Sequence, residues 1–536
     1  MNVRDVAVVD RVLDKFPGDT SSTGLVLLAA AIAVAVLSPV AWLALRTTAI
    51  GYDRAIALLT RPSAVSALVN SVALVTVVTS ASVALGVPLA VLTTRTDLPF
   101  RRFWTVAVSL PLVVPSYIGA FAFVSAFGPH GLLADALSVR LPTIYGFPGA
   151  ALVLTLFIYP YVFISTRAAL LTFDASLVEA ARTLNHGRWA AFRRVTLPRI
   201  VPGIAAGVLL VALYTLSDFG TPAIMHFDTF TRMIYVEFNT FARDMAALLS
   251  LQLLVVTAVI LAIQSRIGSE DAQAYASSNR GAADAIQITL GRWRWPAVIL
   301  PAAVTLLTIV VPIGVLLVWL VRANPGYGGG FAFHWSYGAN SLFVSGLAAV
   351  LATAAAVPIA YLSTSREGRL SSLIERSTFV GYAMPGIVLG LALVYFGASY
   401  APWLYQTIPL LLFAYLVRFM PQAVGTVRSS LLQIDPRLVE ASRTLGRGNL
   451  ATFRHVTLPL VLPGIAAGGA LVFLTTMKEL PATLMLHPTG FKTIVTYIWQ
   501  VQGSGNYGSA AVPALLLVAI SGLSMFVILA RGRYDG

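Results

Sequence analysis

Residues 438–459 read LVEASRTLGRGNLATFRHVTLP and residues 177–198 read LVEAARTLNHGRWAAFRRVTLP, so that 15 of the 22 positions are identical. Both stretches are rich in arginine, whereas the chain around them is strongly apolar. Such close identity between two segments 261 residues apart indicates an internal duplication. The number and type of elements in each copy should therefore determine the fold.

Composition indicates an integral membrane protein. Of the 536 residues, 57% are hydrophobic and 11% are charged, and the mean hydropathy is +0.82. A water-soluble surface cannot be built from this composition. Twelve apolar runs are long enough to cross a bilayer, and each should be a helix because lipid leaves backbone polar groups without other partners. The runs cover residues 24–45, 67–93, 103–127, 149–171, 200–217, 244–264, 296–321, 341–363, 377–399, 405–427, 460–477 and 508–530.

Basic residues set the expected orientation. Most of the 36 Lys and Arg residues fall in alternate loops, which places both termini and both repeated stretches in the cytoplasm. The net charge of +14 is then explained by the inner leaflet, so no nucleic-acid partner is expected. The first run is too long for a signal-peptide core and should be retained as a helix. We therefore expect a multi-pass protein of a cell inner or plasma membrane, and the lack of cysteine excludes disulfides and thiolate metal sites.

The duplication extends over most of the chain. Asn70, Pro88 and Pro115 match Asn340, Pro358 and Pro385 at an offset of 270, whereas Pro160 matches Pro421 at an offset of 261. Six helices in each half give both halves the same orientation, so the repeats are parallel. The sequence predicts an all-α integral membrane protein of about 12 transmembrane helices. Its parts are a first repeat at 1–264, a cytoplasmic linker at 265–295 and a second repeat at 296–536.

Local chemistry predicts a helix–turn–helix in each repeated stretch. Asp174 and Asp435 can each cap the start of a short helix, and Pro436 suits its first turn. The helix should end near Asn185 or Gly446, which are the residue types that most readily adopt the left-handed conformation. A second short helix should then run to the Thr-Leu-Pro at the end of each stretch, where the proline starts the next membrane helix.

The surface of this motif favours docking of another protein over chemistry. Ala180, Ala181 and Ser442 are small enough to allow a close approach, and Glu179 and Glu440 can accept hydrogen bonds from a partner. The alternative is an ordinary amphipathic helix whose basic residues bind anionic lipid. Duplication of the whole motif makes that alternative less satisfactory.

The motif resembles the EAA loop of ABC importer permeases, the membrane subunits of binding-protein-dependent uptake systems. The resemblance covers almost the whole chain and implies the type I ABC importer permease fold, with coupling loops at 174–198 and 435–459 that fit a cleft on a separate ATPase. Asn185 and Ser442 depart from the family's glycine and alanine but keep the same turn chemistry and small size. The residues that the resemblance assigns to ATPase coupling are Glu179, Ala180, Ala181, Asn185, Leu197 and Pro198, with Glu440, Ala441, Ser442, Gly446, Leu458 and Pro459 in the second copy.

A nucleotide site of its own is not expected in this chain. A phosphate-binding P-loop needs Gly-Lys-Ser/Thr, and none of the three lysines, Lys15, Lys478 and Lys492, follows a glycine. The chain should therefore be a transport subunit and not an enzyme, with ATP and Mg bound by the partner. The resemblance implies two ABC ATPase subunits, an extracytoplasmic (periplasmic or extracellular) binding protein and transport by alternating access.

The cargo is suggested by two outer stretches, SDFGTPAIMHFDTFTRMIY at 217–235 and KELPATLMLHPTGFKTIVTYIW at 478–499. An alignment without gaps pairs Asp218 with Glu479 and His226 with His487. Both stretches resemble those of fused two-repeat ferric iron permeases, and ferric ion favours carboxylate oxygen. Six scattered histidines without His-Glu-x-x-His make a permanent metal site unexpected. The two acidic residues could contact iron, dock the binding protein or cap a re-entrant helix.

Arg418 is the one basic residue near mid-membrane, where a charge is costly and usually functional. Its counterpart in the first half is Phe157. It could pair with Glu479, line the pathway, or mark a misplaced helix boundary.

Other functions stay open at this stage. Relatives with the same architecture carry thiamine, polyamines, phosphonates or other small solutes instead of iron. An ion-coupled secondary transporter would need buried coupling acids in mid-helix and no paired EAA loops. An intramembrane enzyme would need a nucleophile–base or metal constellation, and the sequence shows none.

Overall fold

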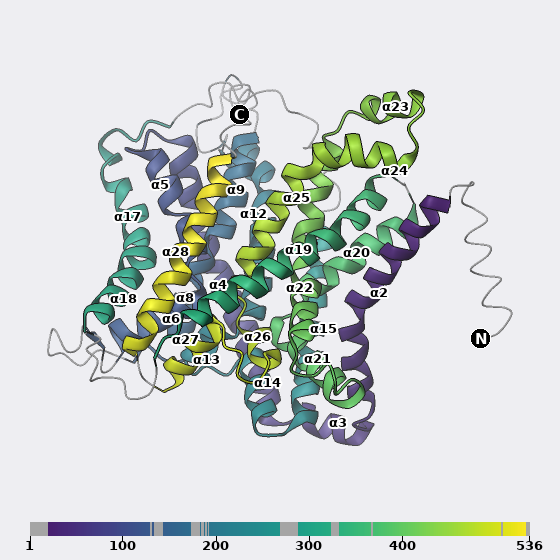
Figure 1. Ribbon diagram of the computed structural model, residues 1–536. Helices are drawn as coiled ribbons and strands as arrows, with labels where there is room; N and C mark the ends of the chain where they lie inside the picture. The colour runs from purple at the N-terminus through teal and green to yellow at the C-terminus, as the bar shows by residue number, and fades with distance from the viewer. Residues whose placement is uncertain are drawn as a thin grey trace. The chain divides into compact units, whose positions relative to one another are not determined.

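A computed structural model of the chain describes residues 20–128, 131–132, 143–172, 183, 187, 190, 192–267, 288–322, 332–365, 368–504 and 507–531 (Figure 1). In these ranges the structure is helical, and the one β-type pairing is an isolated bridge between Thr96 and Ile288. The all-α fold class is therefore confirmed.

The helices follow the order of the two sequence halves. The first half contains α2 (Thr20–Thr48), α3 (Tyr52–Leu59), α4 (Pro62–Arg95), α5 (Arg101–Ala107), η1 (Leu110–Val113), α6 (Ser116–Phe127), α8 (Phe147–Ile158), α9 (Pro160–Thr172), η2 (Phe192–Thr196), α12 (Leu197–Ser217), α13 (Gly220–Ile224), α14 (Phe230–Asn239) and α15 (Arg243–Ile267). The second half contains η3 (Gly291–Trp293), η4 (Pro296–Val298), α17 (Ile299–Thr305), η5 (Leu306–Val310), α18 (Val311–Arg322), α19 (Trp335–Ser365), α20 (Arg369–Ala383), α21 (Gly386–Tyr400), α22 (Ile408–Leu432), α23 (Pro436–Thr444), α24 (Asn449–Thr452), η6 (Phe453–Thr457), α25 (Leu458–Met477), α26 (Pro481–Leu486), α27 (Ile494–Gly503) and α28 (Tyr507–Arg531).

Helices that are long and apolar enough to span a membrane occur where the apolar runs of the sequence predicted them. Within the described ranges, nine helices satisfy both criteria, and up to eleven do so if two bent pairs each count as one span. A shorter apolar helix covers Gly508–Leu523. Each of the twelve apolar runs thus coincides with a long helix, a bent pair or this shorter segment.

The third run of each half is not the single continuous helix that its apolar sequence suggested. The segments Arg101–Val113 and Ser116–Phe127 meet at 94°, and Arg369–Ala383 and Gly386–Tyr400 meet at 101°. The cause is a proline at the same place in each repeat, Pro115 and Pro385. Proline disfavours the helical conformation in the residue before it, and Val114 and Met384 are accordingly extended, with ψ of 120° and 122°.

Two compact units form, and each combines parts of both halves of the sequence. Unit 1 takes the described residues of Met1–Trp42, Ala339–Met384 and Leu389–Phe491. Unit 2 takes those of Leu43–Gly338, Pro385–Val388 and Lys492–Gly536. These units are interleaved along the chain, whereas the predicted division into repeats at 1–264 and 296–536 follows the duplication, and that division stays a prediction.

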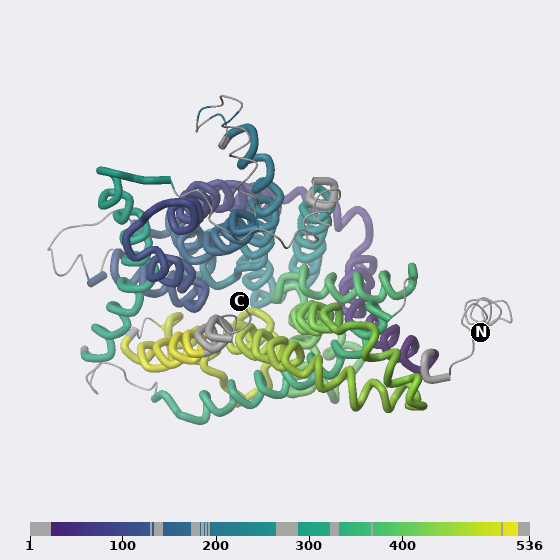
Figure 2. The backbone as a smooth tube through the Cα atoms, turned by 90° about the horizontal axis from the view of Figure 1, so that it is seen from above, coloured from purple at the N-terminus to yellow at the C-terminus, as the bar shows by residue number. Residues whose placement is uncertain are grey.

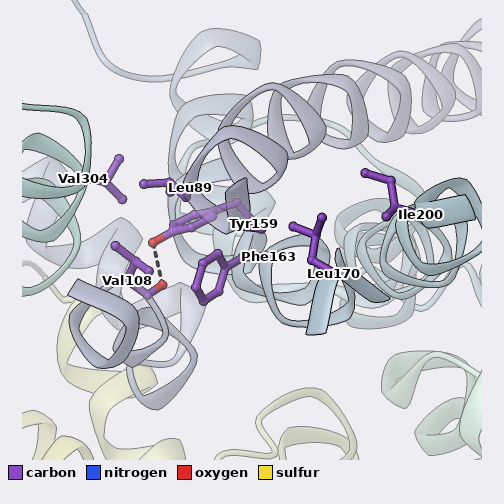
Figure 3. Packing of buried hydrophobic residues seen from close by; sticks show 8 residues of the cluster. Leu89, Val108, Tyr159, Phe163, Leu170, Ile200 and Val304 are labelled. Atoms are coloured by element: carbon purple, nitrogen blue, oxygen red, sulfur yellow. Dashed lines mark hydrogen bonds between the residues drawn. The ribbon is translucent and has the colours of Figure 1, made fainter. Parts of the chain in front are cut away.

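The core of unit 2 is built on α4, α9 and α12, with residues of α5 and α17 against it. Figure 3 shows Leu89, Phe163 and the ring of Tyr159 packed together, and all three side chains are fully buried. The hydroxyl of Tyr159 donates a hydrogen bond of 2.6 Å to the carbonyl oxygen of Val108. A buried polar group is thereby satisfied in an otherwise apolar core. In the same unit α28 packs against α18 (Figure 2).

Close helix contacts recur at equivalent positions in both repeats. In unit 2, a Cβ atom on Gly207 would lie 2.6 Å from the Cα atom of Val162, so α12 approaches α9 at backbone distance. In unit 1, a Cβ atom on Gly468 would lie 3.1 Å from the Cα atom of Ala423, so α25 approaches α22 in the same way. Small residues at such spacing are typical of helix packing in membranes.

The outer segments depart from the gap-free alignment in one respect. That alignment pairs Phe230 with Phe491, yet α14 begins at Phe230 and α27 begins at Ile494, three residues later than the alignment predicts. The extra residues precede α27, where Gly490 has a φ of +80°. The pairing is therefore wrong beyond the short helices α13 and α26.

Candidate functional site

The second coupling segment lies in unit 1 and has the predicted cap at its start. Helix α23 begins at Pro436, and the side chain of Asp435 accepts a hydrogen bond of 3.0 Å from the backbone N–H of Arg437. The side chain thus satisfies a donor that the first helical turn leaves free. The N-terminal cap predicted from Asp435-Pro436 is confirmed.

The same helix ends at the predicted glycine. Gly446 has a φ of +81°, a conformation that glycine adopts without steric cost. Its N–H donates to the carbonyl of Arg443 at 2.9 Å, and the N–H of Arg447 donates to the carbonyl of Ser442 at 3.2 Å. These two bonds close the helix and turn the chain towards α24.

Ser442 contributes more than small size. Its hydroxyl lies 3.0 Å from the hydroxyl of Thr452 at the end of α24, and both side chains are buried. The hydrogen bond joins α23 to α24 across the turn. Alanine, which stands at the equivalent place in the first copy (Ala181), could not make this bond.

The second short helix does not stop at the proline, contrary to the sequence-based expectation. From Asn449 to Met477 the chain is helical without a break, through α24, the π-turn η6 and α25. Leu458 opens α25 directly after the π-turn η6, and Pro459 follows it, so the proline lies inside this continuous helix. The coupling segment is thus continuous with a candidate membrane span.

Apolar side chains project from the coupling segment. Leu438, Leu445 and Leu450 are 49%, 83% and 78% exposed, and Glu440 and Ala441 beside them are exposed too. Leu438 and Leu445 are seven residues apart, so they lie on one side of α23. Exposed leucines clustered on a polar helix are typical of a surface that contacts another protein or a membrane. Figure 1 shows α23 and α24 at the opposite end of α25 from α26.

The first coupling segment is described only in part. Glu179, Ala180, Ala181 and Asn185 lie outside the described residues. Leu197 opens α12 with Pro198 in its first turn, and the π-turn η2 at Phe192–Thr196 precedes them. The same turn stands at Phe453–Thr457 in the second copy, so the described part repeats the second segment's geometry.

Asp218 caps the short helix α13 in unit 2. One carboxylate oxygen accepts from the backbone N–H of Gly220 at 3.0 Å, and the other accepts from the hydroxyl of Thr221 at 2.9 Å. The residue is 9% exposed. Of the interpretations left open by the sequence, capping of a short helix is the one that these contacts bear out.

Glu479 has the equivalent role in unit 1. Its Oε1 accepts from the backbone N–H of Ala482 at 3.2 Å in the first turn of α26. Its Oε2 lies 3.3 Å from Nε of Arg418, and the two side chains are only 7% and 14% exposed. The pairing between Arg418 and Glu479 that the sequence left as a hypothesis is therefore present.

Arg418 links three elements of unit 1. From α22 it reaches Glu479 before α26, and its Nη1 lies 3.5 Å from the carbonyl oxygen of Met384 at the break between α20 and α21. Nearby, the hydroxyls of Tyr415 and Thr483 lie 2.7 Å apart, which adds a second bond between α22 and α26. Sequence reasoning did not select Tyr415 or Thr483, although Tyr415 lies one helical turn from Arg418.

The first half replaces this charged network by aromatic packing. Phe157, the counterpart of Arg418, is 2% exposed and packs edge-on against Phe123 with centroids 6.3 Å apart. It also covers Gly119, where a Cβ atom would collide with its ring. The asymmetry expected from the sequence thus extends to the surroundings of each residue.

The two histidines have different settings. His226 is exposed, has a φ of +52° and stacks on Tyr145 with ring centroids 5.1 Å apart. His487 is half-buried, and its Nδ1 lies 3.1 Å from the carbonyl oxygen of Pro488. In the part of the chain that the structure describes, no group of three His, Asp or Glu residues is placed to hold a metal ion.

Comparison with known proteins gives a match in both halves. A family model described as "Binding-protein-dependent transport system inner membrane component" matches residues 82–270 and 350–531. The chain is 32% identical over 494 residues to the Fe(3+)-transport system permease protein FbpB 2 of Haemophilus influenzae, covering 91% of this chain and 94% of that protein.

Two further relatives differ in how much they cover. The ferric transport system permease protein FbpB of Actinobacillus pleuropneumoniae is 24% identical over 83% of this chain and 68% of its own length. The molybdenum transport system permease protein ModB of Mycobacterium tuberculosis is 34% identical over 42% of this chain and 88% of its own length. The molybdenum permease thus matches less than half of this chain, whereas the two iron permeases match most of it.

Proposed function

The chain belongs to the family of binding-protein-dependent transport system inner membrane components, and on that premise we propose that it carries ferric iron into the cell as the permease subunit of an ATP-driven importer. The permease takes its cargo from a binding protein outside the membrane and releases it to the cytoplasm by alternating access. Both termini and both coupling segments face the cytoplasm, as the distribution of Lys and Arg favours.

The coupling segment is the observation that supports energy transfer from a partner. Helix α23 is fixed at both ends by its caps and is tied to α24 by Ser442, while Leu438 and Leu445 stay exposed. A movement of α23 is passed directly to α25 because α24, η6 and α25 form one continuous helix. A partner that grips α23 can therefore shift a membrane span.

The partner in this proposal is an ATPase. The sequence has no Gly-Lys-Ser/Thr, so ATP and Mg are bound on another chain. Two coupling segments per chain favour two ATPase subunits, one for each. An ion-coupled secondary transporter, the alternative of a different class, would have no use for such segments.

Iron is favoured as cargo by the relatives that span both halves. The two described above as Fe(3+) or ferric transport permeases cover 91% and 83% of the chain, whereas the molybdenum permease covers 42% of it. The capping contacts of Asp218 and Glu479 leave their carboxylates engaged, which favours a permease that passes iron on without a permanent site. Thiamine, a polyamine, a phosphonate or another small solute is the alternative cargo.

The coupling role is tested on the exposed leucines. Leu438→Asp with Leu445→Asp is expected to bind the partner ATPase about 100-fold more weakly, because full burial of one leucine contributes about 1.5–3 kcal/mol. Retention of the ATPase during purification and ATP-driven uptake into proteoliposomes are the measurements. Leu438→Met with Leu445→Met is the matched control and should retain both. Normal ATPase binding by the aspartate variant would contradict the proposal.

The cargo is tested on the binding protein that the permease accepts. Its melting temperature should rise with ferric salts and stay unchanged with thiamine, polyamines or phosphonates. A rise with an organic solute alone would exclude iron as the principal cargo, and it would leave the coupling role untouched.

A further inference from the structure

A cluster of arginine and aromatic residues in unit 2 has no part in the coupling or outer sites. It forms where two segments distant in sequence meet, residues 95–103 and 288–295. The N–H of Ile288 donates to the carbonyl of Arg95 at 2.7 Å, and the N–H of Leu290 donates to Oδ1 of Asp97 at 2.8 Å. These bonds hold the end of the linker against the loop that precedes α5.

The two segments enclose an open cavity of about 530 Å³. Arg101, Arg102 and Arg294 line it together with Phe100 and Phe103. Its one carboxylate, Asp97, already accepts the bond from Leu290. Among the described residues, the three guanidinium groups form no ion pair, and with a single carboxylate in the lining the cavity has a net positive charge.

The location of the cavity fits the membrane–water interface. It lies where two candidate spans begin, the bent pair that starts at Arg101 and the span Gly291–Val321, and α5 packs against α17 (Figure 1). Phe100 and Phe103 are 76% and 60% exposed, and Trp293 and Trp295 beside Arg294 are also exposed. Exposed aromatic rings among arginines at a span's end are typical of the headgroup level.

We propose that this cavity binds the phosphate of an acidic phospholipid headgroup. Arginine presents its donors in a fork that matches phosphate oxygens, and the neighbouring aromatic rings can lie among the upper acyl chains. The lipid belongs to the cytoplasmic leaflet, a placement that rests on the orientation in the proposed function. A lipid here fastens the end of the linker to the start of the bent pair α5–α6.

The repeat shows that the fold does not require the cluster. At the offset of 270 given by Pro88 with Pro358 and Pro115 with Pro385, Arg101 and Arg102 correspond to Ser371 and Ser372. The flanking Phe100 and Phe103 correspond to Leu370 and Leu373. The second half thus forms the equivalent bent pair with serine at both of these positions, which sets the site in the first half apart.

The test compares variants that exchange arginine for the residue of the other repeat. Arg101→Ser with Arg102→Ser should bind phosphatidylglycerol roughly 30-fold more weakly, because each basic residue near an anionic surface contributes about a fivefold change in affinity. Arg369→Ser with Arg376→Ser on α20 removes the same charge and should bind as the unaltered protein does. Native mass spectrometry of the full chain, released from phosphatidylcholine nanodiscs with or without phosphatidylglycerol, counts the retained lipids.

Three results would overturn the proposal. The first is equal retention of phosphatidylglycerol by Arg101→Ser with Arg102→Ser and by Arg369→Ser with Arg376→Ser. The second is equal retention of phosphatidylcholine and phosphatidylglycerol by the unaltered protein. The third is displacement of the lipid by inorganic phosphate alone. If the double exchange fails to fold, Arg294→Ser is the second variant. Its affinity for phosphatidylglycerol is expected to fall about fivefold. The measurement needs neither ATPase nor iron, so its failure is distinct from a failure of the proposed function.

Discussion

At the residue scale, Arg418 and Glu479 form an ion pair in which each charge stabilises the other. Both are largely buried, and their side chains form an ion pair with Nε and Oε2 3.3 Å apart. Removal of one partner leaves the other charge buried without its ion pair, which costs about 3–5 kcal/mol in proteins. Replacement of both by uncharged side chains avoids that cost.

The expected outcome is a non-additive double-variant cycle. Arg418→Met alone should lower the thermal unfolding midpoint clearly, whereas Arg418→Met with Glu479→Gln should recover most of the loss. Unfolding in detergent and uptake in proteoliposomes are measured on the same preparations. If the double variant recovers stability but not uptake, the pair belongs to the transport pathway. If Arg418→Met alone folds well and retains full uptake, Arg418 has no role in transport.

Gly446 gives a second prediction at this scale. Its φ of +81° is costly for a β-branched residue but accessible to asparagine, which the first repeat has at Asn185. Gly446→Asn should therefore retain ATPase binding, and Gly446→Val should weaken it by disturbing the end of α23. Equal ATPase binding by the two variants would show that the turn does not position the helix.

At the scale of elements, the glycines of α25 decide how closely it approaches α22. A methyl group on Gly468 would meet the hydroxyl of Thr426 and the backbone at Ala423, whereas one on the adjacent Gly469 would make ordinary contact with Thr353 at 3.5 Å. Alanine favours a helix over glycine by about 1 kcal/mol, so only the contact distinguishes the two sites. Gly468→Ala should lower the thermal midpoint and Gly469→Ala should not. A matching loss in both would show that helix spacing is not the cause.

The elements also show what the sequence could predict and what it could not. The caps at Asp435 and Gly446 follow from side chains acting on their own neighbouring backbone, so the local sequence was sufficient. The bends at Pro115 and Pro385 needed more, since proline is tolerated inside other spans such as α4 and α19 at Pro88 and Pro358. Which proline breaks a helix depends on the packing around it.

The sequence did not predict which helices join to form each compact unit. The apolar runs give no sign that α2 up to Trp42 joins a unit made mostly of second-half helices, because lipid-facing and helix-facing leucines have the same hydropathy. The alignment of the outer stretches was correct for Asp218 and Glu479 and then failed before α27, where extra residues enter a turn. Motifs that act locally were predictable, whereas of the contacts between distant helices only the pairing of Arg418 with Glu479 was raised as a hypothesis.

On the scale of the whole molecule, the duplication gives one chain two coupling segments. A mutation in one segment can disrupt that segment and leave the other intact. Glu440 is exposed beside Leu438, and Glu179 stands at the same place in the first copy. An arginine at either position brings a like charge to the basic residues of its segment and removes an acceptor for the partner. Each ATPase should be lost independently, because the two segments belong to different repeats.

Glu440→Arg or Glu179→Arg alone should therefore leave one ATPase bound per permease, and the double variant should leave none. Native mass spectrometry of the complex gives the stoichiometry, and ATP-driven uptake should fall sharply in the single variants if transport needs both ATPases to close on ATP together. Asp53→Arg, at an exposed acidic residue in the first turn of α3, is the control for a general effect of added charge. Two ATPases on the double variant would mean that the repeated stretches are not the docking sites, and the duplication would then need another explanation.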